Sequence, residues 1–252
     1  MTLIEKVNKL IDFAKTHKWF QSTYISSRDN LAIFQNNAIL TEIPPVDTSM
    51  ILSFERAFEG CKNLKTLPWI DTSNSTSFEY MFRYCEALES IPSIDTSNGT
   101  KFREMFYNCL SLKEIPLLDV SKGTTLYGFC RGCRNLEKFS RVDTSNSTSF
   151  GYMFYSCSNL KTIELLDFSK VTSASSMFTY CNALENISVV PNTISVSLTI
   201  PSPVLSSESI QSIVDGLRVT DYARTLTFNS EIAENLTEDQ IVAVYEKGWD
   251  LG

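Results

Sequence analysis

The stretch Phe78 to Ile94, FEYMFRYCEALESIPSI, recurs along the chain in imperfect copies at one fixed spacing. Cysteine, leucine and aspartate columns each repeat every 24 residues. Their members are Cys61, Cys85, Cys109, Cys133, Cys157 and Cys181; Leu64, Leu88, Leu112, Leu136, Leu160 and Leu184; and Asp47, Asp71, Asp95, Asp119, Asp143 and Asp167. A period of roughly 20 to 50 residues is typical of proteins whose units bury their apolar sides only against their neighbours. The spacing therefore predicts one elongated solenoid.

Each repeat unit contains two segments of different character. The first reads L-x-x-[I/L]-P-x-[I/L]-D-T-S-N and favours a short strand, whereas the second, F-x-x-M-F-x-x-C, favours a helical turn or a short irregular arc. Stacked units would place the strands in a parallel sheet. The expected fold class is an α/β solenoid with a parallel β-sheet on one face, helical turns on the other, and helical caps at both ends.

The period also predicts three parts of the chain: an N-terminal helical cap over residues 1–39, the repeat array over 40–190, and a C-terminal cap of irregular repeats with two helices over 191–252. Residues 2–16 have apolar side chains at helical spacing, and the segment from Trp19 to Asn37 is expected to be a short strand or loop.

The C-terminal cap has its own local signals. Strands are expected at 194–200, 225–228 and 249–251. Ser206 is the expected N-cap of a helix over 207–217. Thr237 and Gln240 form a capping box for a second helix, which ends at Lys247 and is stopped by Gly248.

Composition argues against several classes of function. The net charge is -7, and the lysines and arginines are scattered, so no nucleic-acid surface is expected. No apolar run approaches the roughly 18 residues of a membrane span, so no membrane insertion is expected. The first eighteen residues mix charges among apolar positions, unlike a signal peptide, so export by the usual route is not expected.

The cysteine column is best explained as a buried ladder, because a buried thiol behaves as a small hydrophobic group. Cys130 and Cys133 form a C-x-x-C pair, but a zinc site would need a second pair of ligands and the only histidine is His17. Cys130 also occupies the column that otherwise holds phenylalanine, with Phe129 in the methionine column. No metal and no cofactor is expected.

The aspartate column has two possible roles. Six stacked acids could bind calcium, but the glycine-rich loops with several acids per turn that such sites use are absent. Each Asp opens a D-[T/V/F]-S turn, where its carboxylate can accept main-chain N–H groups two or three residues further on. The turn-forming role is favoured.

No motif for nucleophilic, zinc-hydrolytic or nucleotide chemistry is present, so a non-enzymatic protein is expected, with glycoside cleavage by paired carboxylates as the remaining catalytic alternative. Aromatic and cationic residues at non-core positions form a candidate binding stripe: Tyr80, Arg83, Tyr84, Tyr107, Arg131, Tyr152, Tyr155 and Tyr180. These tyrosines could equally serve only to cover the coil surface. On the strand side, Trp69 and Leu117 share one column and could mark a partner contact.

At these repeats the sequence resembles the BspA-like class of leucine-rich repeats, in the variant with D-T-S-N-x-T-x-F-x-x-M-F-x-x-C-x-x-L-x-x-I-P units, over about residues 40–190. The tail, TLTFNSEIAENLTEDQIVAVYEKGWDLG, is similar to the terminal segment of many such proteins in gut-type bacteria and their phages or prophages. The units depart from the family pattern after D-T-S-N, where small residues replace an apolar one and should make the coil thinner.

The resemblance implies a binding or structural protein of a phage particle, tail-associated or elsewhere in the virion and assembled in the host cytoplasm. Its expected partners are other virion proteins or a host-surface protein or glycan, and a homo-oligomer is possible. The alternative implied by the same family is a bacterial adhesin or interaction module at the cell surface or in the cytoplasm.

Overall fold

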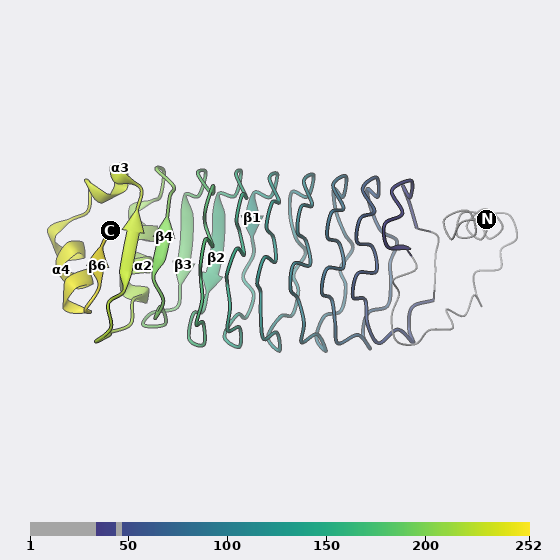
Figure 1. The fold of residues 1–252 in the computed structure, drawn as a ribbon, viewed down its shortest axis with the longest axis horizontal. Helices are drawn as coiled ribbons and strands as arrows, with labels where there is room; N and C mark the ends of the chain where they lie inside the picture. Colours follow the sequence, from purple (N-terminus) through teal and green to yellow (C-terminus); the bar gives the residue numbers. More distant parts are fainter. Residues whose placement is uncertain (1–33, 44–46) are drawn as a thin grey trace, which may run out of the picture.

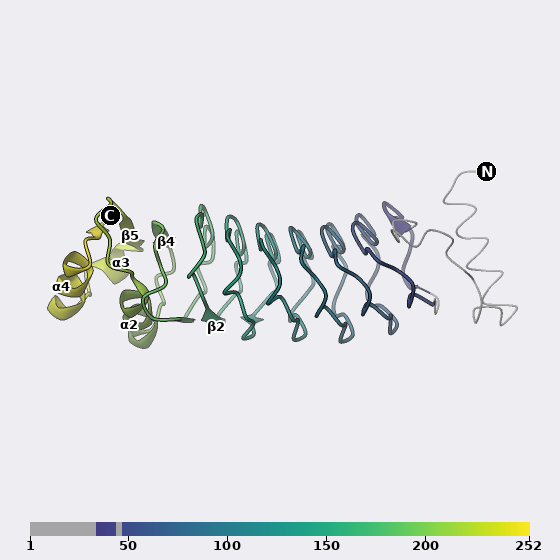
Figure 2. The same cartoon turned by 90° about the horizontal axis from the view of Figure 1, so that it is seen from below.

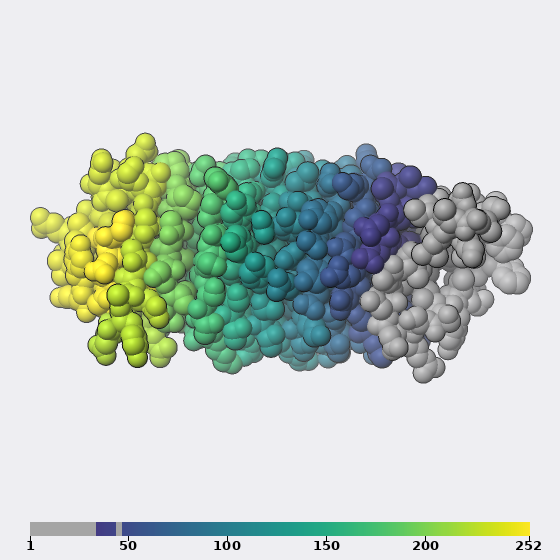
Figure 3. Space-filling model, viewed as in Figure 1, coloured from purple at the N-terminus to yellow at the C-terminus, as the bar shows by residue number. Residues whose placement is uncertain are grey.

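The computed structural model describes residues 34–43 and 47–252. Over this range the chain winds into coils that lie side by side along a rod, in the order of the sequence (Figures 1 and 2). The C-terminal helices lie at one end, and the space-filling view shows the coils in contact along the rod (Figure 3). The helix expected over 2–16 and most of the segment that begins at Trp19 lie outside the described residues.

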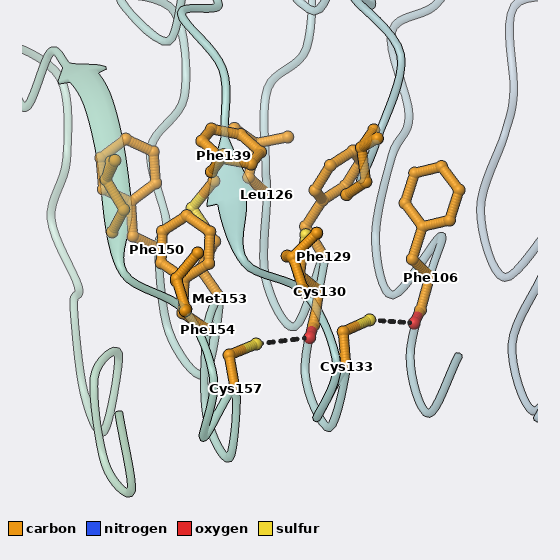
Figure 4. Packing of buried hydrophobic residues seen from close by; sticks show 14 of the residues in the cluster. Phe106, Leu126, Phe129, Cys130, Cys133, Phe139, Phe150, Met153, Phe154 and Cys157 are labelled. Carbon is orange, nitrogen blue, oxygen red and sulfur yellow. Dashed lines mark hydrogen bonds between the residues drawn. The ribbon is translucent and has the colours of Figure 1, made fainter. Parts of the chain in front are cut away.

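The cysteine column lies inside the rod, where every member is buried and unpaired with another cysteine. Each of the six thiols donates a hydrogen bond of 2.9–3.1 Å to the main-chain carbonyl oxygen 27 residues earlier. Cys133, for example, donates to Phe106 (Figure 4). Burial raises the pKa of Cys61 to about 12, so its thiol keeps the proton that it donates.

Phenylalanine rings stack beside the cysteines. The ring centroids of Phe58 and Phe82 are 5.6 Å apart, and those of Phe82 and Phe106 are 5.5 Å apart. The stack changes where Cys130 replaces a phenylalanine: Phe129 meets Phe106 edge-on, at 5.3 Å. The C-x-x-C pair therefore arises because the large and the small side chain have changed places between two adjacent core columns, with Phe129 in the methionine column and Cys130 in the phenylalanine column.

Small residues after the D-T-S-N turn make room for a second row of rings. A Cβ atom added to Gly99 would lie 2.4 Å from Cζ of Phe102 and 3.0 Å from Cε2 of Phe78. Ser75 and Ser147, in the same column, are fully buried. The coil is thus filled at this point by rings from neighbouring positions, and a larger residue would clash with them.

The M-F-x-x-C arc consists of tight turns, so of the two structures expected for this segment the short irregular arc is observed and the helical turn is not. In the arc over 54–61, the N–H of Ala57 donates to the carbonyl of Phe54, and the N–H of Cys61 donates to the carbonyl of Phe58. The residue before each donor has a positive φ, 56° at Arg56 and 74° at Gly60. Such a residue interrupts a right-handed helix and fits the third position of a type II turn.

The remaining N–H groups of the arc point along the rod. Phe54 donates to the carbonyl of Ser77 at 2.9 Å and Phe58 donates to that of Met81 at 3.0 Å, both in the next coil. Later arcs repeat this alternation. Every second N–H therefore closes its own arc while the others hold the arc to its neighbour, which satisfies the main-chain groups without a helix.

The strand segments pair as a small parallel sheet, in the order β1-β2-β3, in only part of the array. Its strands are β1 (Lys138–Phe139), β2 (Thr162–Leu166) and β3 (Asn186–Val189). At one position of this segment the earlier coils carry Pro68, Pro92 and Pro116, whereas the later coils carry Ser140, Glu164 and Ser188. Proline has no N–H to donate to a ladder, so the expected sheet is interrupted in the described earlier coils.

The aspartate column forms the turns that follow. Asp47 Oδ1 accepts hydrogen bonds from the N–H and the hydroxyl of Ser49, at 3.0 and 2.7 Å. The other five aspartates accept the N–H two residues on, at 2.7–3.0 Å. This is the Asx-turn geometry that the D-[T/V/F]-S pattern predicts. Among the described residues, no group of three or more His, Cys, Asp or Glu side chains is arranged to hold a metal ion.

The C-terminal part forms a second parallel sheet, ordered β4-β5-β6, with three helices. Its elements are β4 (Leu198–Ile200), α2 (Ser207–Gly216), β5 (Thr225–Phe228), α3 (Ser230–Ala233), α4 (Glu238–Glu246) and β6 (Asp250–Leu251). The Ser206 cap and the capping box of Thr237 with Gln240 are confirmed. Helix α3 was not predicted, although Asn229 caps it by accepting the N–H of Glu231.

Candidate recognition surface

A row of arginine and tyrosine side chains follows the arcs from coil to coil, and we call it the Arg/Tyr stripe. The sequence predicted Tyr80, Arg83, Tyr84, Tyr107, Arg131, Tyr152, Tyr155 and Tyr180. Ring contacts and stacked guanidinium groups connect these residues and add three that sequence reasoning missed: Arg56, Arg103 and Tyr127. Most members are partly exposed, and Tyr180 is 57% exposed.

The tight turns position the stripe. Tyr80 and Tyr152 have φ values of 57° and 55°, and Tyr84 and Tyr180 have values of 61° and 65°. This backbone conformation is costly for residues other than glycine, by roughly 1–2 kcal/mol each. Since serine, asparagine and glycine hold the same positions in other arcs, the conformation is a property of the repeat. It presents the stripe on backbone that is fixed by hydrogen bonds within and between coils.

Arg83 is surrounded by three rings and two carboxylates. Its guanidinium carbon lies 5.3 Å from the ring centroid of Tyr80, 4.9 Å from that of Tyr84 and 5.2 Å from that of Tyr107. Its Nη1 is 3.3 Å from Glu59, and its Nε is 3.2 Å from Glu104. These acids offset the charge of Arg83 within the protein.

Glu59 and Glu104 are the acidic residues that sequence reasoning missed, and they are only 7% and 8% exposed. Glu59 also accepts a hydrogen bond from Arg56 at 2.8 Å, and Glu104 lies 3.7 Å from Nε of Arg103. Glu59 and Arg83 are 24 residues apart. An acid followed by an arginine in one column was the available signal for Glu59, because side chains in one column become neighbours when coils stack.

Arg131 has the same kind of aromatic frame without the acids. Its guanidinium carbon lies 5.1 Å from the ring centroid of Tyr107, 4.9 Å from that of Tyr152 and 5.0 Å from that of Tyr155. Within residues 34–43 and 47–252, no carboxylate lies at ion-pair distance from it. Among the described residues, the charge of Arg131, the last arginine of the stripe along the chain, therefore faces tyrosine rings and no carboxylate.

The rings continue past Arg131 toward the exposed Tyr180. Tyr152 and Tyr155 lie with centroids 5.6 Å apart, and Tyr155 meets Tyr180 edge-on at 5.4 Å. At the other side of the frame, burial raises the pKa of Tyr107, so its phenol is protonated near neutral pH. The stripe thus combines apolar ring faces with hydroxyl groups that can donate and accept hydrogen bonds.

The strand side carries the second predicted set. Trp69 is 72% exposed and Leu117 is 71% exposed, and the described residues do not cover either. Leu117 lines an open, shallow pocket of about 380 Å³ together with Asp95, Asp119 and Arg141. Trp69 and Leu117 occupy a different column of the repeat from the residues of the Arg/Tyr stripe, and the structure does not place them beside the stripe.

Two further observations concern the class of protein. Among the described residues, no helix is both long and apolar enough to cross a membrane. The family model described as "Mycoplasma protein of unknown function, DUF285" matches the chain twice, over residues 29–140 and 91–192. The search of curated proteins and the search of solved structures each found no match.

Proposed function

Because the chain belongs to this DUF285 family, whose matches overlap along the repeat array, we propose that it is a BspA-like leucine-rich repeat solenoid that acts as a non-enzymatic recognition protein. The Arg/Tyr stripe is the surface that contacts its partner. The overlapping matches support a repeated unit, as does the 24-residue hydrogen-bond pattern between coils.

The observation that carries the proposal is the frame of three tyrosine rings around each of Arg83 and Arg131. Tyrosine and arginine are enriched at interfaces and among the few residues that supply most of the binding energy there. Rings and guanidinium groups that already hold one another lose little side-chain freedom when a partner binds. A stripe of this kind is therefore suited to contact a protein or a glycan.

The proposed setting is a phage particle. It is supported by the resemblance of the tail residues to the terminal segments of phage and prophage members of the BspA-like class. In that setting the partner is another virion protein or a ligand on the host surface. The family is described as a Mycoplasma protein of unknown function, and this favours a second candidate setting, a bacterial adhesin or interaction module.

Purified particles distinguish the two settings. Mass spectrometry and immunogold labelling of virions from a lysate of the strain that carries the gene should detect the protein, and its position separates tail-tip recognition from an internal role. Absence from particles, combined with sensitivity to added protease on intact cells, would instead support the adhesin.

The contact surface itself is tested by pull-down with the purified protein. The double variant Tyr152→Ala and Tyr155→Ala should lose the partner, while Trp69→Ala on the strand side should keep it. The opposite pattern would move the recognition surface to the strand side. Circular dichroism should verify that each variant keeps the wild-type fold.

A further inference from the structure

We propose that Arg131 and the tyrosines around it form a binding site for an acidic sugar, one that carries a carboxylate or a sulfate. The inference names the ligand class for part of the Arg/Tyr stripe and so rests on the proposed recognition function. It depends on the contrast between two arginines in one column, Arg83 and Arg131.

The two arginines have similar aromatic surroundings and opposite electrostatic ones. Each guanidinium carbon lies between 4.9 and 5.3 Å from three tyrosine rings. Glu59 and Glu104 lie 3.3 and 3.2 Å from Arg83, whereas no carboxylate of the described residues pairs with Arg131. Arg83 is therefore part of the internal structure, and Arg131 retains the capacity to pair with an external anion.

Glu104 is the acid that could have paired with Arg131, because it lies beside Gly128 in the arc of Arg131. A Cβ atom added to Gly128 would be 2.8 Å from Cγ of Glu104 and 3.9 Å from Cβ of Arg131. The carboxylate of Glu104 is instead engaged by Nε of Arg83 at 3.2 Å and by Nε of Arg103 at 3.7 Å. Two arginines already share this acid, so it offers little neutralisation to a third.

The guanidinium of Arg131 carries the donors for an external anion. Its N–H groups lie in one plane and form a fork that matches a carboxylate or a sulfate, and no carboxylate of the described residues lies at ion-pair distance from it. Arg131 is only partly exposed, so a bound anion would be shielded from water on the protein side. This shielding strengthens a charge-assisted hydrogen bond.

The surrounding rings favour a sugar over an acidic peptide. Tyr152, Tyr155 and Tyr180 form a continuous series of ring contacts leading away from Arg131. Their faces carry partial negative charge and attract the C–H groups of a sugar ring, and their hydroxyl groups can bond to sugar hydroxyls. An acidic side chain would use the cation alone and leave this aromatic series without a contact.

The net charge of the chain favours a short acidic ligand over a long polyanion. With a net charge of -7, the protein repels long polyanions, so binding that depends on many cations along a polymer is disfavoured. One guanidinium framed by rings suits a single acidic sugar at the end or branch of a glycan. The anionic group could be a carboxylate or a sulfate, and the probes below separate the two.

The test is isothermal titration of the full-length protein with sialyllactose as a carboxylate probe, sulfated lactose as a sulfate probe, and lactose as the neutral control. Either acidic probe should bind at least tenfold more tightly than lactose, and affinity should fall as salt is raised from 0.05 to 0.5 M. Failure of both acidic probes with a folded protein overturns the inference. Tight binding of a glutamate-rich peptide with no gain for either sugar also overturns it.

Substitutions at two residues of the same coil, Arg131 and Arg134, locate the site. Arg131→Gln should lower the affinity for the acidic probe at least tenfold, and Arg131→Lys should lower it by less, because lysine keeps the charge without the planar fork. Arg134→Gln is the matched control: Arg134 is exposed in the same coil, and its loss changes the net charge equally. Equal effects of R131Q and R134Q would overturn the assignment. If the acidic probes fail while the pull-down still depends on Tyr152 and Tyr155, only the sugar inference falls.

Discussion

The thiol of Cys157 donates a hydrogen bond to the main-chain carbonyl oxygen of Cys130, which lies 3.0 Å away in the preceding coil (Figure 4). The carbonyl oxygens at this position in other coils also accept two hydrogen bonds each. That of Phe58, for instance, receives the N–H of Cys61 in its own arc and the thiol of Cys85 in the next. The cysteine column is therefore a second line of hydrogen bonds along the rod, parallel to that of the main chain.

Replacement of a thiol in the middle of this line should affect several coils. Cys109→Asp places a carboxyl group without a cationic partner in the core and should cost about 3–5 kcal/mol of the free energy of unfolding. Cys109→Ala removes only the hydrogen bond to Phe82 and some volume, so its cost should be smaller. Urea unfolding measures both, and hydrogen exchange should show faster opening in the flanking coils of the Asp variant. An unchanged midpoint for C109D would mean that this column does not face the core.

Alanine at Gly99 should be poorly tolerated. Its Cβ would lie 2.4 Å from Phe102 and 2.9 Å from the carbonyl of Thr96, so rings and backbone would have to move, at a cost of about 1–3 kcal/mol. Gly151→Ala is the matched control, because its nearest neighbour is a ring carbon of Tyr127 at 3.2 Å, on a side chain that can shift. Thermal unfolding should show the larger loss for G99A. Equal losses would contradict the tight packing of the second row of rings.

Substitution by glycine should stabilise the protein at Ser176 and destabilise it at Ser175, the residue before it. Ser176 has a φ of 53°, so Ser176→Gly relieves a conformation that is costly for serine and should raise the free energy of unfolding by about 0.5–1 kcal/mol. Ser175 has no positive φ, so Ser175→Gly should lower it by about 0.5–1 kcal/mol. Both serines are exposed, which keeps packing effects small. Chemical unfolding checks the signs, and the same sign for both variants would contradict the turn assignment.

The turn at Asp47 should contribute a stability that depends on pH. The hydroxyl and then the N–H of Ser49 hold the pKa of Asp47 below its ordinary value of 3.8. A lowered folded-state pKa gives a contribution that is present above the pKa of the unfolded chain and is lost as pH falls through the folded pKa. NMR titration should find a low pKa for Asp47, and Ser49→Ala should raise it while Ser49→Thr should not. If Asp47 had the same pKa in the Ser49→Ala variant as in the wild type, the hydroxyl of Ser49 would not be a cause of the lowered pKa.

The turn and cap residues were the most predictable part of the fold. Strand β5 has the predicted bounds, and the capping box of Thr237 and Gln240 opens α4 as expected, because both depend on local sequence. The arcs were not predictable in the same way. Tyr80 and Tyr84 adopt a left-handed backbone that their own preferences oppose, and bonds to the adjacent coils stabilise it.

Most of the partly exposed residues of the candidate site were predicted, because tyrosines and arginines outside the core columns are recognisable from their position in the repeat. Arg56, Arg103 and Tyr127 were missed, and so were the buried acids. Glu59 and Glu104 could not be recognised in this way, because an acidic residue in a repeat is expected at the surface. Only the arginine of a neighbouring coil explains why these two are buried. Their pairing arises from tertiary stacking, and it is also what distinguishes Arg83 from Arg131.

The hydrogen bonds that join one arc to the following arc recur at the same positions in successive coils: the N–H groups of Phe54, Phe78, Leu126 and Phe150, for example, each donate to the coil that follows. Neighbouring coils in this part of the array therefore offer one another matching donors and acceptors. An in-frame duplication or loss of 24 residues within the array would leave those donors and acceptors matched on both sides of the junction. The length of the rod is therefore a trait that recombination can change in whole repeat units. Each such event would alter the distance between Arg131 and the C-terminal helices, or the charge pattern of the stripe, while leaving the architecture intact.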